Sequence, residues 1–178
     1  MKRKILFITT ISGFLYQFEM NDVKILQEAG YEIHYASNMD IPVYSFDREA
    51  METQGIVFHH VSISKKPTKL VQNYWALKQI RKIIREEGID VVHVHNPMGG
   101  IVGRLAAFLE KHVYIIYTAH GFHFFKGAPF SSNLYYIAEK YLAKYTDGII
   151  TINSEDFEAA KKISKKTSSK TSSAKEVN

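Results

Sequence analysis

The chain has 178 residues, of which 46% are hydrophobic and 13% aromatic, so it can fold as one domain around a large core. It contains no cysteine, which excludes a disulfide framework, a thiolate nucleophile and a cysteine-ligated zinc site. The net charge is +5, and basic residues gather in residues 65–85 and 161–175. Such stretches attract phosphates, anionic lipids or nucleic acid, but they are equally typical of a solvated helix face and a charged tail.

The amino terminus superficially resembles a signal peptide, because basic residues 2–4 precede apolar residues 5–8. The apolar segment then breaks at Thr9, and no small-residue cleavage pattern follows. No apolar run approaches the ~18 residues of a membrane-spanning helix. The pattern therefore predicts a first β-strand in a cytoplasmic protein.

Short β-branched or aromatic runs alternate with longer amphipathic segments. The predicted strands are residues 4–9, 32–36, 57–63, 90–95, 113–118 and 148–152. The predicted helices are residues 16–29, 47–53, 69–87, 98–109 and 133–145, followed by a last helix with Ser154 as its N-cap. Gly30 and Gly88 sit just beyond two of these helices, as C-terminal glycines do.

This alternation predicts an α/β, Rossmann-like three-layer domain, in which helices cover both faces of a mostly parallel sheet. The domain is expected to comprise residues 1–164. Residues 165–178 are rich in Lys, Ser and Thr and lack apolar periodicity, so we expect them to form a disordered tail.

The helix predicted over residues 69–87 has two distinct faces. The apolar residues at helical spacing, which should face the sheet, are Leu70, Tyr74, Leu77, Ile80 and Ile84. The basic residues on a neighbouring face are Lys78, Arg81, Lys82 and Arg85. The favoured interpretation is an ordinary surface helix with extended basic side chains, and the alternative is weak docking to an anionic membrane surface.

The first strand ends in a loop that contains Ser12, Gly13 and Phe14. Backbone amides at such a turn, ahead of a helix, can form an anion site, although a plain tight turn is an equally good interpretation. Neither the G-x-G-x-x-G pattern nor a Walker lysine is present, which disfavours NAD binding and P-loop chemistry.

Histidines follow two other predicted strands. His93, His95 and Asn96 lie at the end of one, and His120 and His123 follow the next in the sequence His-Gly-Phe-His. Ligands bind at the carboxyl ends of the strands in open α/β sheets. If these strands are neighbours, the four imidazoles converge at one edge of the sheet, which predicts a functional site there.

Two kinds of site fit that convergence. Imidazole is the commonest metal ligand, but these loops lack the additional carboxylates that hydrolytic metal sites usually have. The other interpretation is a metal-free cleft in which His120 binds or polarises an anionic or hydroxyl-rich substrate. The remaining histidines, which we expect to be structural or on the surface, are His34, His59, His60 and His112.

Five segments, taken in this order and spacing, resemble a known family: residues 4–13, 26–33, 90–96, 118–123 and 146–153. The chain is similar, to about residue 163, to the N-terminal half of family-4 glycosyltransferases, which have the two-domain GT-B fold. It looks most like the branch that builds bacterial capsule, exopolysaccharide or lipopolysaccharide.

The resemblance implies an acceptor-binding domain that faces a nucleotide-sugar donor across a cleft, with retaining transfer and no metal or other cofactor. His120 would lie beside the donor sugar and assist the transfer. The loop of Ser12, Gly13 and Phe14 would approach the donor diphosphate. The residues expected to line the acceptor side are His93, His95, Asn96 and His123.

The E-x7-E motif of the family's donor domain does not occur, so we expect a missing or separately encoded donor-binding domain and an inactive isolated chain. The expected partners are a saccharide or polyprenyl-diphosphate-linked acceptor and an anionic membrane surface at the inner face of the cell membrane. Nucleic acid is not expected, because the basic residues lack interleaved exposed aromatics. The alternatives are a histidine-rich metal-dependent hydrolase and a non-catalytic binding module in polysaccharide assembly.

Overall fold

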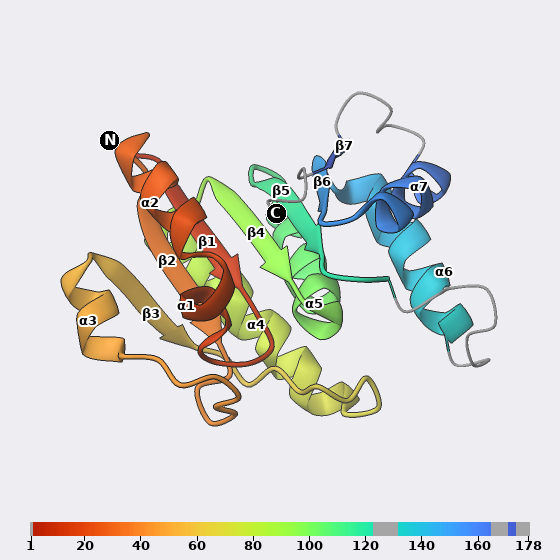
Figure 1. Ribbon diagram of the computed structural model, residues 1–178. Helices are drawn as coiled ribbons and strands as arrows, with labels where there is room; N and C mark the ends of the chain where they lie inside the picture. Colours follow the sequence, from red (N-terminus) through yellow and green to blue (C-terminus); the bar gives the residue numbers. More distant parts are fainter. Residues whose placement is uncertain (1, 123–131, 165–170, 174–178) are drawn as a thin grey trace.

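The computed structural model describes residues 2–122, 132–164 and 171–173 (Figure 1). Within them, a parallel sheet has the strand order β3-β2-β1-β4-β5-β6-β7. The strands are β1 (Lys4–Ile8), β2 (Glu32–Ser37), β3 (Ile56–His60), β4 (Val91–His95), β5 (Tyr114–Ala119), β6 (Gly148–Thr151) and β7 (Thr171–Ser173). The helices are α1 (Phe14–Phe18), α2 (Met20–Glu28), α3 (Arg48–Thr53), α4 (Leu70–Glu87), α5 (Pro97–Phe108), α6 (Ser132–Leu142), the 3-10 turn η1 (Ala143–Tyr145) and α7 (Ser154–Ile163).

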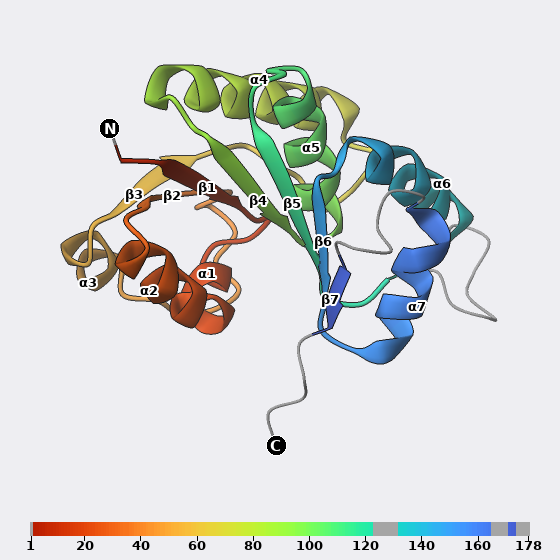
Figure 2. The same ribbon diagram turned by 90° about the horizontal axis from the view of Figure 1, so that it is seen from above.

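Alternate residues of the central strands supply two separate cores, as the two-residue period of a strand requires. Ile5 and Phe7 of β1 face the side of α1, α2 and α3, where they pack near Leu15. Leu6 and Ile8 face the opposite side, which α4 and α5 cover. Figure 2 shows these two helical layers on either face of the sheet. The predicted Rossmann-like three-layer fold is confirmed.

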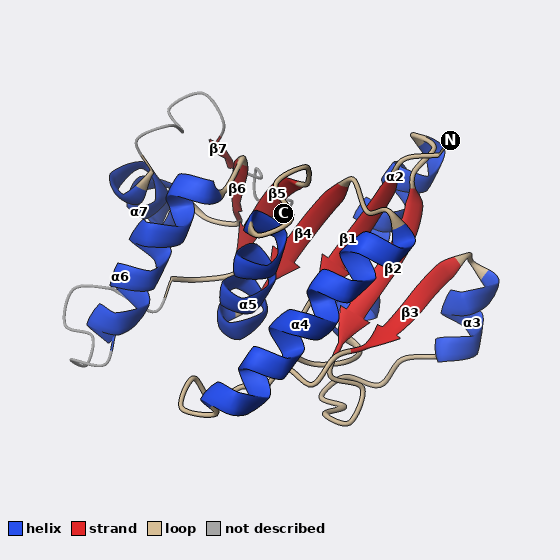
Figure 3. Ribbon diagram, turned by 180° about the vertical axis from the view of Figure 1, so that it is seen from behind, coloured by secondary structure: helices blue, strands red, loops and turns tan. Residues whose placement is uncertain are grey.

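The strand order places a topological switch point between β1 and β4. From β1 the chain winds outward through β2 to β3, and it then returns to β4 on the other side and winds outward through β5 to β6. All strands point the same way (Figure 3), so their following loops meet at one edge of the sheet. A crevice at a switch point of this kind is where open α/β sheets bind ligands.

The predicted helix over residues 16–29 is in fact two helices. It breaks at Glu19, whose backbone angles of φ −119° and ψ 6° are not helical. The side chain of Glu19 is consequently buried at the carboxyl edge of the sheet rather than exposed on a continuous helix. The break therefore contributes a residue to the site described below.

The predicted buried face of α4 is wrong in its first turns. Leu70 and Tyr74 are 74% and 53% exposed, whereas Ile80 and Ile84 are fully buried as expected. The reason is that α4 begins beyond the carboxyl edge of the sheet (Figure 3), so its first turns have no strand beneath them. The apolar residues in these first turns therefore do not contribute to the core.

The tail also differs from the expectation at three residues. Thr171–Ser173 form the short strand β7, parallel to β6. Backbone pairing with the open edge of a sheet needs no apolar side chain, so the composition of the segment gave no sign of it.

Candidate functional site

The loop after β1 is held rigidly at the switch point. Ser12 is buried, and both its backbone amide and its hydroxyl donate to the carbonyl of Ile41 at 3.3 Å. Gly13 has a left-handed backbone (φ 80°), and a Cβ atom there would collide with the carbonyl oxygen of Tyr44. Only glycine fits this position. The Ser12 hydroxyl is already engaged, so a ligand at this loop would meet backbone rather than the serine side chain.

The ends of β1 and β4 are tied together through polar contacts. The backbone amide of Thr10 donates to Oδ1 of Asn96 at 3.2 Å, and the amide of Gly99 donates to the Thr10 hydroxyl at 2.9 Å. Asn96 has φ 62° and ψ 158°, a strained conformation for a non-glycine residue. Such strain gathers at functional sites, and here it turns the chain sharply from β4 into α5.

A cavity of about 250 Å³ opens beside this junction, and we name it the switch-point pocket. Its lining residues are Thr10, Ile11, Lys65, Asn96, Pro97, Met98 and Tyr135. They combine a lysine and an amide with apolar walls, as small-molecule sites do. The pocket could therefore hold a polar, negatively charged group.

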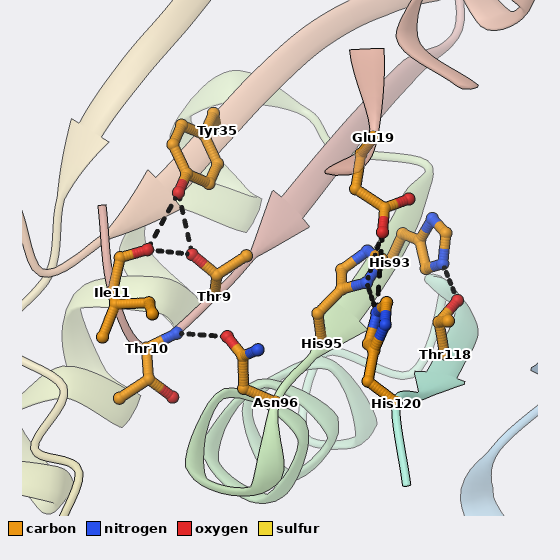
Figure 4. Close-up of polar contacts among 10 residues, drawn as sticks. All are labelled: Thr9, Thr10, Ile11, Glu19, Tyr35, His93, His95, Asn96, Thr118 and His120. Carbon is orange, nitrogen blue, oxygen red and sulfur yellow. Dashed lines mark hydrogen bonds and ion pairs between the residues drawn. The ribbon is translucent and has the colours of Figure 1, made fainter. Parts of the chain in front are cut away.

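Glu19, His95 and His120 form a cluster next to this junction (Figure 4). Nδ1 of His95 lies 3.1 Å from Nε2 of His120, and Oε1 of Glu19 lies 3.4 Å and 3.5 Å from these two nitrogens. Glu19 and His95 are buried, whereas the His120 side chain is 25% exposed. Two buried groups thus hold one ring nitrogen of a solvent-facing histidine.

The cluster packs against the Phe14 ring and against His93, which makes a hydrogen bond of its own. The Phe14 ring lies 5.6 Å from the His95 ring and 5.1 Å from the His120 ring, centroid to centroid. Nε2 of His93 lies 2.7 Å from the hydroxyl of Thr118, within the sheet. His93 is buried and stacks close to His95, with 4.3 Å between ring centroids. His93 is therefore a support for His95 rather than part of the exposed surface.

Burial makes the whole cluster electrically neutral near neutral pH. Burial, with a lesser contribution from neighbouring Asp22, raises the pKa of Glu19 to about 8. Burial and the neighbouring His120 lower the pKa of His93 to about 3, and burial also lowers the pKa values of His95 and His120. Glu19 therefore contacts the two imidazoles as a neutral, polar group rather than as one partner of an ion pair.

Glu19→Gln should remove a pH dependence of stability. The folded protein holds a proton on Glu19 that the unfolded chain releases near pH 4.5, so stability falls as the pH rises until the folded pKa of about 8 is passed. Between pH 7 and 8 the buried histidines contribute little, because their ordinary pKa is 6.5, and this contribution is the same in the wild type and in Glu19→Gln. We expect the unfolding free energy of the wild type, relative to Glu19→Gln, to fall by about 1 kcal/mol over this interval in urea titrations. If the unfolding free energies of the two proteins changed in parallel with pH, the inference that Glu19 is protonated would be wrong.

The loop that carries His120 is fixed by α7. The backbone amide of Phe122 donates to Oδ1 of Asp156 at 2.8 Å. Gly121, which lies between His120 and Phe122, has a φ angle of 113°. Asp156 is itself buried and receives a hydrogen bond from Asn153, the N-cap of α7, at 2.7 Å. Asp156 therefore positions the segment directly after His120.

A buried ion pair joins α5 to α6 behind β5. The Arg104 guanidinium donates to both carboxylate oxygens of Glu139, at 2.8 Å and 2.7 Å, and lies 4.1 Å from the centre of the Tyr117 ring. Nε of Arg104 donates to the Gly100 carbonyl at 2.8 Å. Tyr117 lies in β5 only three residues before His120, so this pair stabilises the strand that carries the cluster.

The structure brings four of the predicted site residues together: Phe14, His93, His95 and His120. Asn96 and the loop of Ser12 and Gly13 lie beside them at the switch point. His123 lies outside the described residues.

Sequence reasoning missed Glu19, Thr10 and Asp156. Glu19 gave no signal, because a glutamate within a predicted amphipathic helix is ordinarily exposed. Asp156 could have been found as an acidic residue at the start of a helix that follows the last strand.

The cluster also has the donor atoms of a metal site. The candidate ligand atoms of Glu19, His95 and His120 all lie within 4.8 Å of one another. His93 directs its Nε2 to Thr118 instead. The geometry of the cluster is therefore compatible with a metal site and with a metal-free cleft.

A family model described as "Glycosyl transferase 4-like" matches residues 4–153. The chain is 37% identical over 164 residues to the Bacillus subtilis (strain 168) protein named "Putative glycosyltransferase EpsD", a match that covers 90% of this chain and 40% of EpsD. It is 34% identical over 90 residues to the Escherichia coli UDP-Gal:alpha-D-GlcNAc-diphosphoundecaprenol alpha-1,3-galactosyltransferase, covering 50% of this chain and 23% of that enzyme. The chain thus spans less than half the length of these relatives.

The fold is shared with sucrose-phosphate synthase from Thermosynechococcus elongatus, with a TM-score of 0.70 and 12% identity. That match covers 96% of this chain and 47% of the synthase, as expected of one half of a GT-B fold. The named relatives are transferases and give the hydrolase alternative no support. Since the family model spans most of the sequence, the chain belongs to the glycosyl transferase 4-like family.

Proposed function

We propose that this chain is the acceptor-binding half of a retaining glycosyltransferase, which transfers a sugar from a nucleotide-sugar to a lipid-linked saccharide in the synthesis of a capsule, exopolysaccharide or lipopolysaccharide. The observation that carries the proposal is the cluster of Glu19, His95 and His120 at the switch point of a glycosyl transferase 4-like chain. The Escherichia coli relative, whose name specifies a diphosphoundecaprenol-linked acceptor, supports the class of substrate.

Residues 1–164 would form the acceptor domain, and Thr171–Ser173 add the edge strand β7 to its sheet. The nucleotide-sugar would be bound by a second half that is not among these 178 residues, either continuous with this chain or separately encoded. The carboxyl edge of the sheet would face that half, because the cluster and the switch-point pocket both open there.

Each residue at the edge has a role that follows from its contacts. Nε2 of His120 is engaged by His95 and Glu19, so Nδ1 is the nitrogen that would bind the donor sugar. His95 is buried beneath His120, so it would act on the acceptor side by holding Nε2 of His120 in place. Asn96 and, from outside the described residues, His123 would complete the acceptor side. The backbone at Gly13 and the Phe14 ring would lie near the donor diphosphate, as would Ser12.

Sugar transfer by a full-length protein that contains this chain tests the proposal. A labelled nucleotide-sugar and a short-chain polyprenyl-diphosphate saccharide should yield a lipid-linked product one sugar longer, with the anomeric configuration of the donor retained. The reaction should continue in the presence of a chelator, since no step is assigned to a metal. Release of free sugar without transfer, or transfer abolished by the chelator, would contradict the proposal.

No helix in the described part of the chain is long and apolar enough to cross a membrane. An exposed patch instead covers the start of α4, and we name it the α4 patch: Leu70, Val71, Tyr74, Trp75 and the surrounding Lys65, Lys66, Lys69 and Lys78. Lys78 lies over the Tyr74 and Trp75 rings, 5.0 Å and 5.5 Å from their centroids. Exposed apolar side chains together with several exposed lysines suit an anionic lipid surface.

The α4 patch lies at the same edge of the sheet as the cluster, so binding to the membrane would bring the site toward a lipid-linked acceptor (Figure 3). Lys65 contributes to both the patch and the switch-point pocket. We therefore propose peripheral association with an anionic membrane through the start of α4.

Lys65→Gln combined with Lys69→Gln should weaken binding to phosphatidylglycerol vesicles by about 2 kcal/mol, or about 30-fold, because each lysine near an anionic surface contributes about 1 kcal/mol. Trp75→Ser should also weaken binding. Ile25→Ser, which changes an apolar side chain that is 61% exposed on the opposite helical layer, is the matched control and should have no effect in co-sedimentation assays. Equal losses in the control and the patch variants would exclude a specific patch.

A further inference from the structure

A second group of potential metal ligands lies away from the site, where β2 and the edge strand β3 meet the end of α4. It consists of His34 of β2, His59 of β3 and Glu87, the last residue of α4, whose donor atoms all lie within 4.8 Å of one another. Nδ1 of His34 is 2.9 Å from Nε2 of His59, and the two rings are nearly parallel, at 9°. His34 lies in the middle of β2, opposite Leu6 of β1, and faces the side of the sheet that α4 covers.

Glu32 fixes the orientation of the buried ring. Its Oε1 lies 2.9 Å from Nε2 of His34 and 3.1 Å from the Lys4 ammonium. Because the same oxygen also contacts the Lys4 ammonium, Glu32 acts as the acceptor and Nε2–H of His34 donates to it. With Nε2 directed to Glu32, the His34 ring presents Nδ1 toward His59. A carboxylate behind a ligand histidine is the usual outer support of a metal site.

A simple hydrogen bond between the two imidazoles would explain why His34 and His59 lie together. It would not explain why the Glu87 carboxylate lies close to both of them. His34 is completely buried, whereas His59 and Glu87 are partly exposed, so an ion could enter from the side of the helix end.

We propose that His34, His59 and Glu87 form a binding site for zinc or a similar divalent transition metal. Two imidazole nitrogens and one carboxylate oxygen are a known zinc donor set, with water in the fourth position. The bound ion would join β3, the edge strand of the sheet, to β2 and to the end of α4. The site is independent of the proposed transferase reaction.

Calorimetric titration of the metal-free chain with zinc chloride tests this proposal. Every variant in this titration also carries His120→Gln, so that the cluster of Glu19, His95 and His120 lacks one ligand and does not compete for zinc. This background should bind one equivalent of zinc and unfold at a higher temperature when zinc is present. His59→Gln and Glu87→Gln should abolish both effects, and Glu32→Gln should weaken zinc binding by about 10- to 100-fold because it removes only the outer support.

His60→Gln is the matched control, since His60 is the next residue along β3 and its side chain is 42% exposed near Asp40. It should bind zinc as the background does. Circular dichroism verifies that each variant is folded. The proposal fails if the folded background binds no zinc, or if His59→Gln binds zinc as tightly as His60→Gln.

Discussion

His120→Ala in a full-length enzyme that contains this chain should lower kcat by about 10²- to 10⁴-fold, the range expected when a positioned catalytic group is lost. His120 is the member of the cluster with an exposed side chain, and its Nε2 is held by His95 and Glu19. His120 is thus preorganised, so it can stabilise charge on the reacting sugar without a change in its own position. Because the proposed role of His120 is in the transition state, KM for the acceptor should change much less than kcat.

The control for this prediction is His112→Ala, which changes an exposed histidine at the opposite edge of the sheet, before β5. Its kinetics should match those of the wild type. If His120→Ala retained full turnover, the assignment of His120 would be wrong. If it raised KM alone, His120 would bind the acceptor and not assist the transfer.

Breaking the pair of Arg104 and Glu139 should destabilise the chain by about 3–5 kcal/mol, which is the usual cost of leaving one charge of a buried pair without its partner. Arg104 is completely buried and Glu139 nearly so. Glu139→Gln leaves the guanidinium charge in the core, and Arg104→Met leaves the carboxylate there. The double variant Arg104→Met/Glu139→Leu should be more stable than either single variant, because no unpaired charge remains.

Urea unfolding measures these differences. The exposed pair of Arg48 and Glu52, with side chains 56% and 48% exposed, is the comparison, and Arg48→Met should cost less than about 1 kcal/mol. A double variant less stable than both single variants would contradict this prediction, because the two losses would then add and an unpaired buried charge would carry no extra cost. Equal small losses in all variants would show that water reaches the pair.

The fold could be predicted from the sequence because it depends on local patterns. Apolar runs mark the central strands, and Gly30 and Gly88 end their helices with the left-handed angles expected of C-terminal glycines. The predicted N-cap Ser154 was one residue off, since the side chain of Asn153 accepts from the amide of Asp156 at 2.8 Å. Helix boundaries depend on single hydrogen bonds that the apolar pattern does not specify.

The site could be predicted only in part, because half of it depends on contacts between distant segments. His95 and His120 were recognisable as histidines at strand ends. Glu19 joins them only because the backbone breaks between α1 and α2, a conformation without a sequence signature here. The pairing of Arg104 with Glu139 likewise spans 35 residues and two helices. The exposed first turns of α4 depend on where the sheet ends, which helical periodicity does not show.

The measurement that tests the central claim most directly is imidazole NMR of this chain titrated with a short-chain polyprenyl-diphosphate saccharide and, separately, with a nucleotide-sugar. The acceptor should shift the resonances of His95 and His120 and leave those of His34 and His59 unchanged. The nucleotide-sugar should bind at least about 100-fold more weakly, because the donor half would lie outside these residues. Tight binding of the nucleotide-sugar, or an acceptor that shifts neither His95 nor His120, would contradict an acceptor site at the switch point.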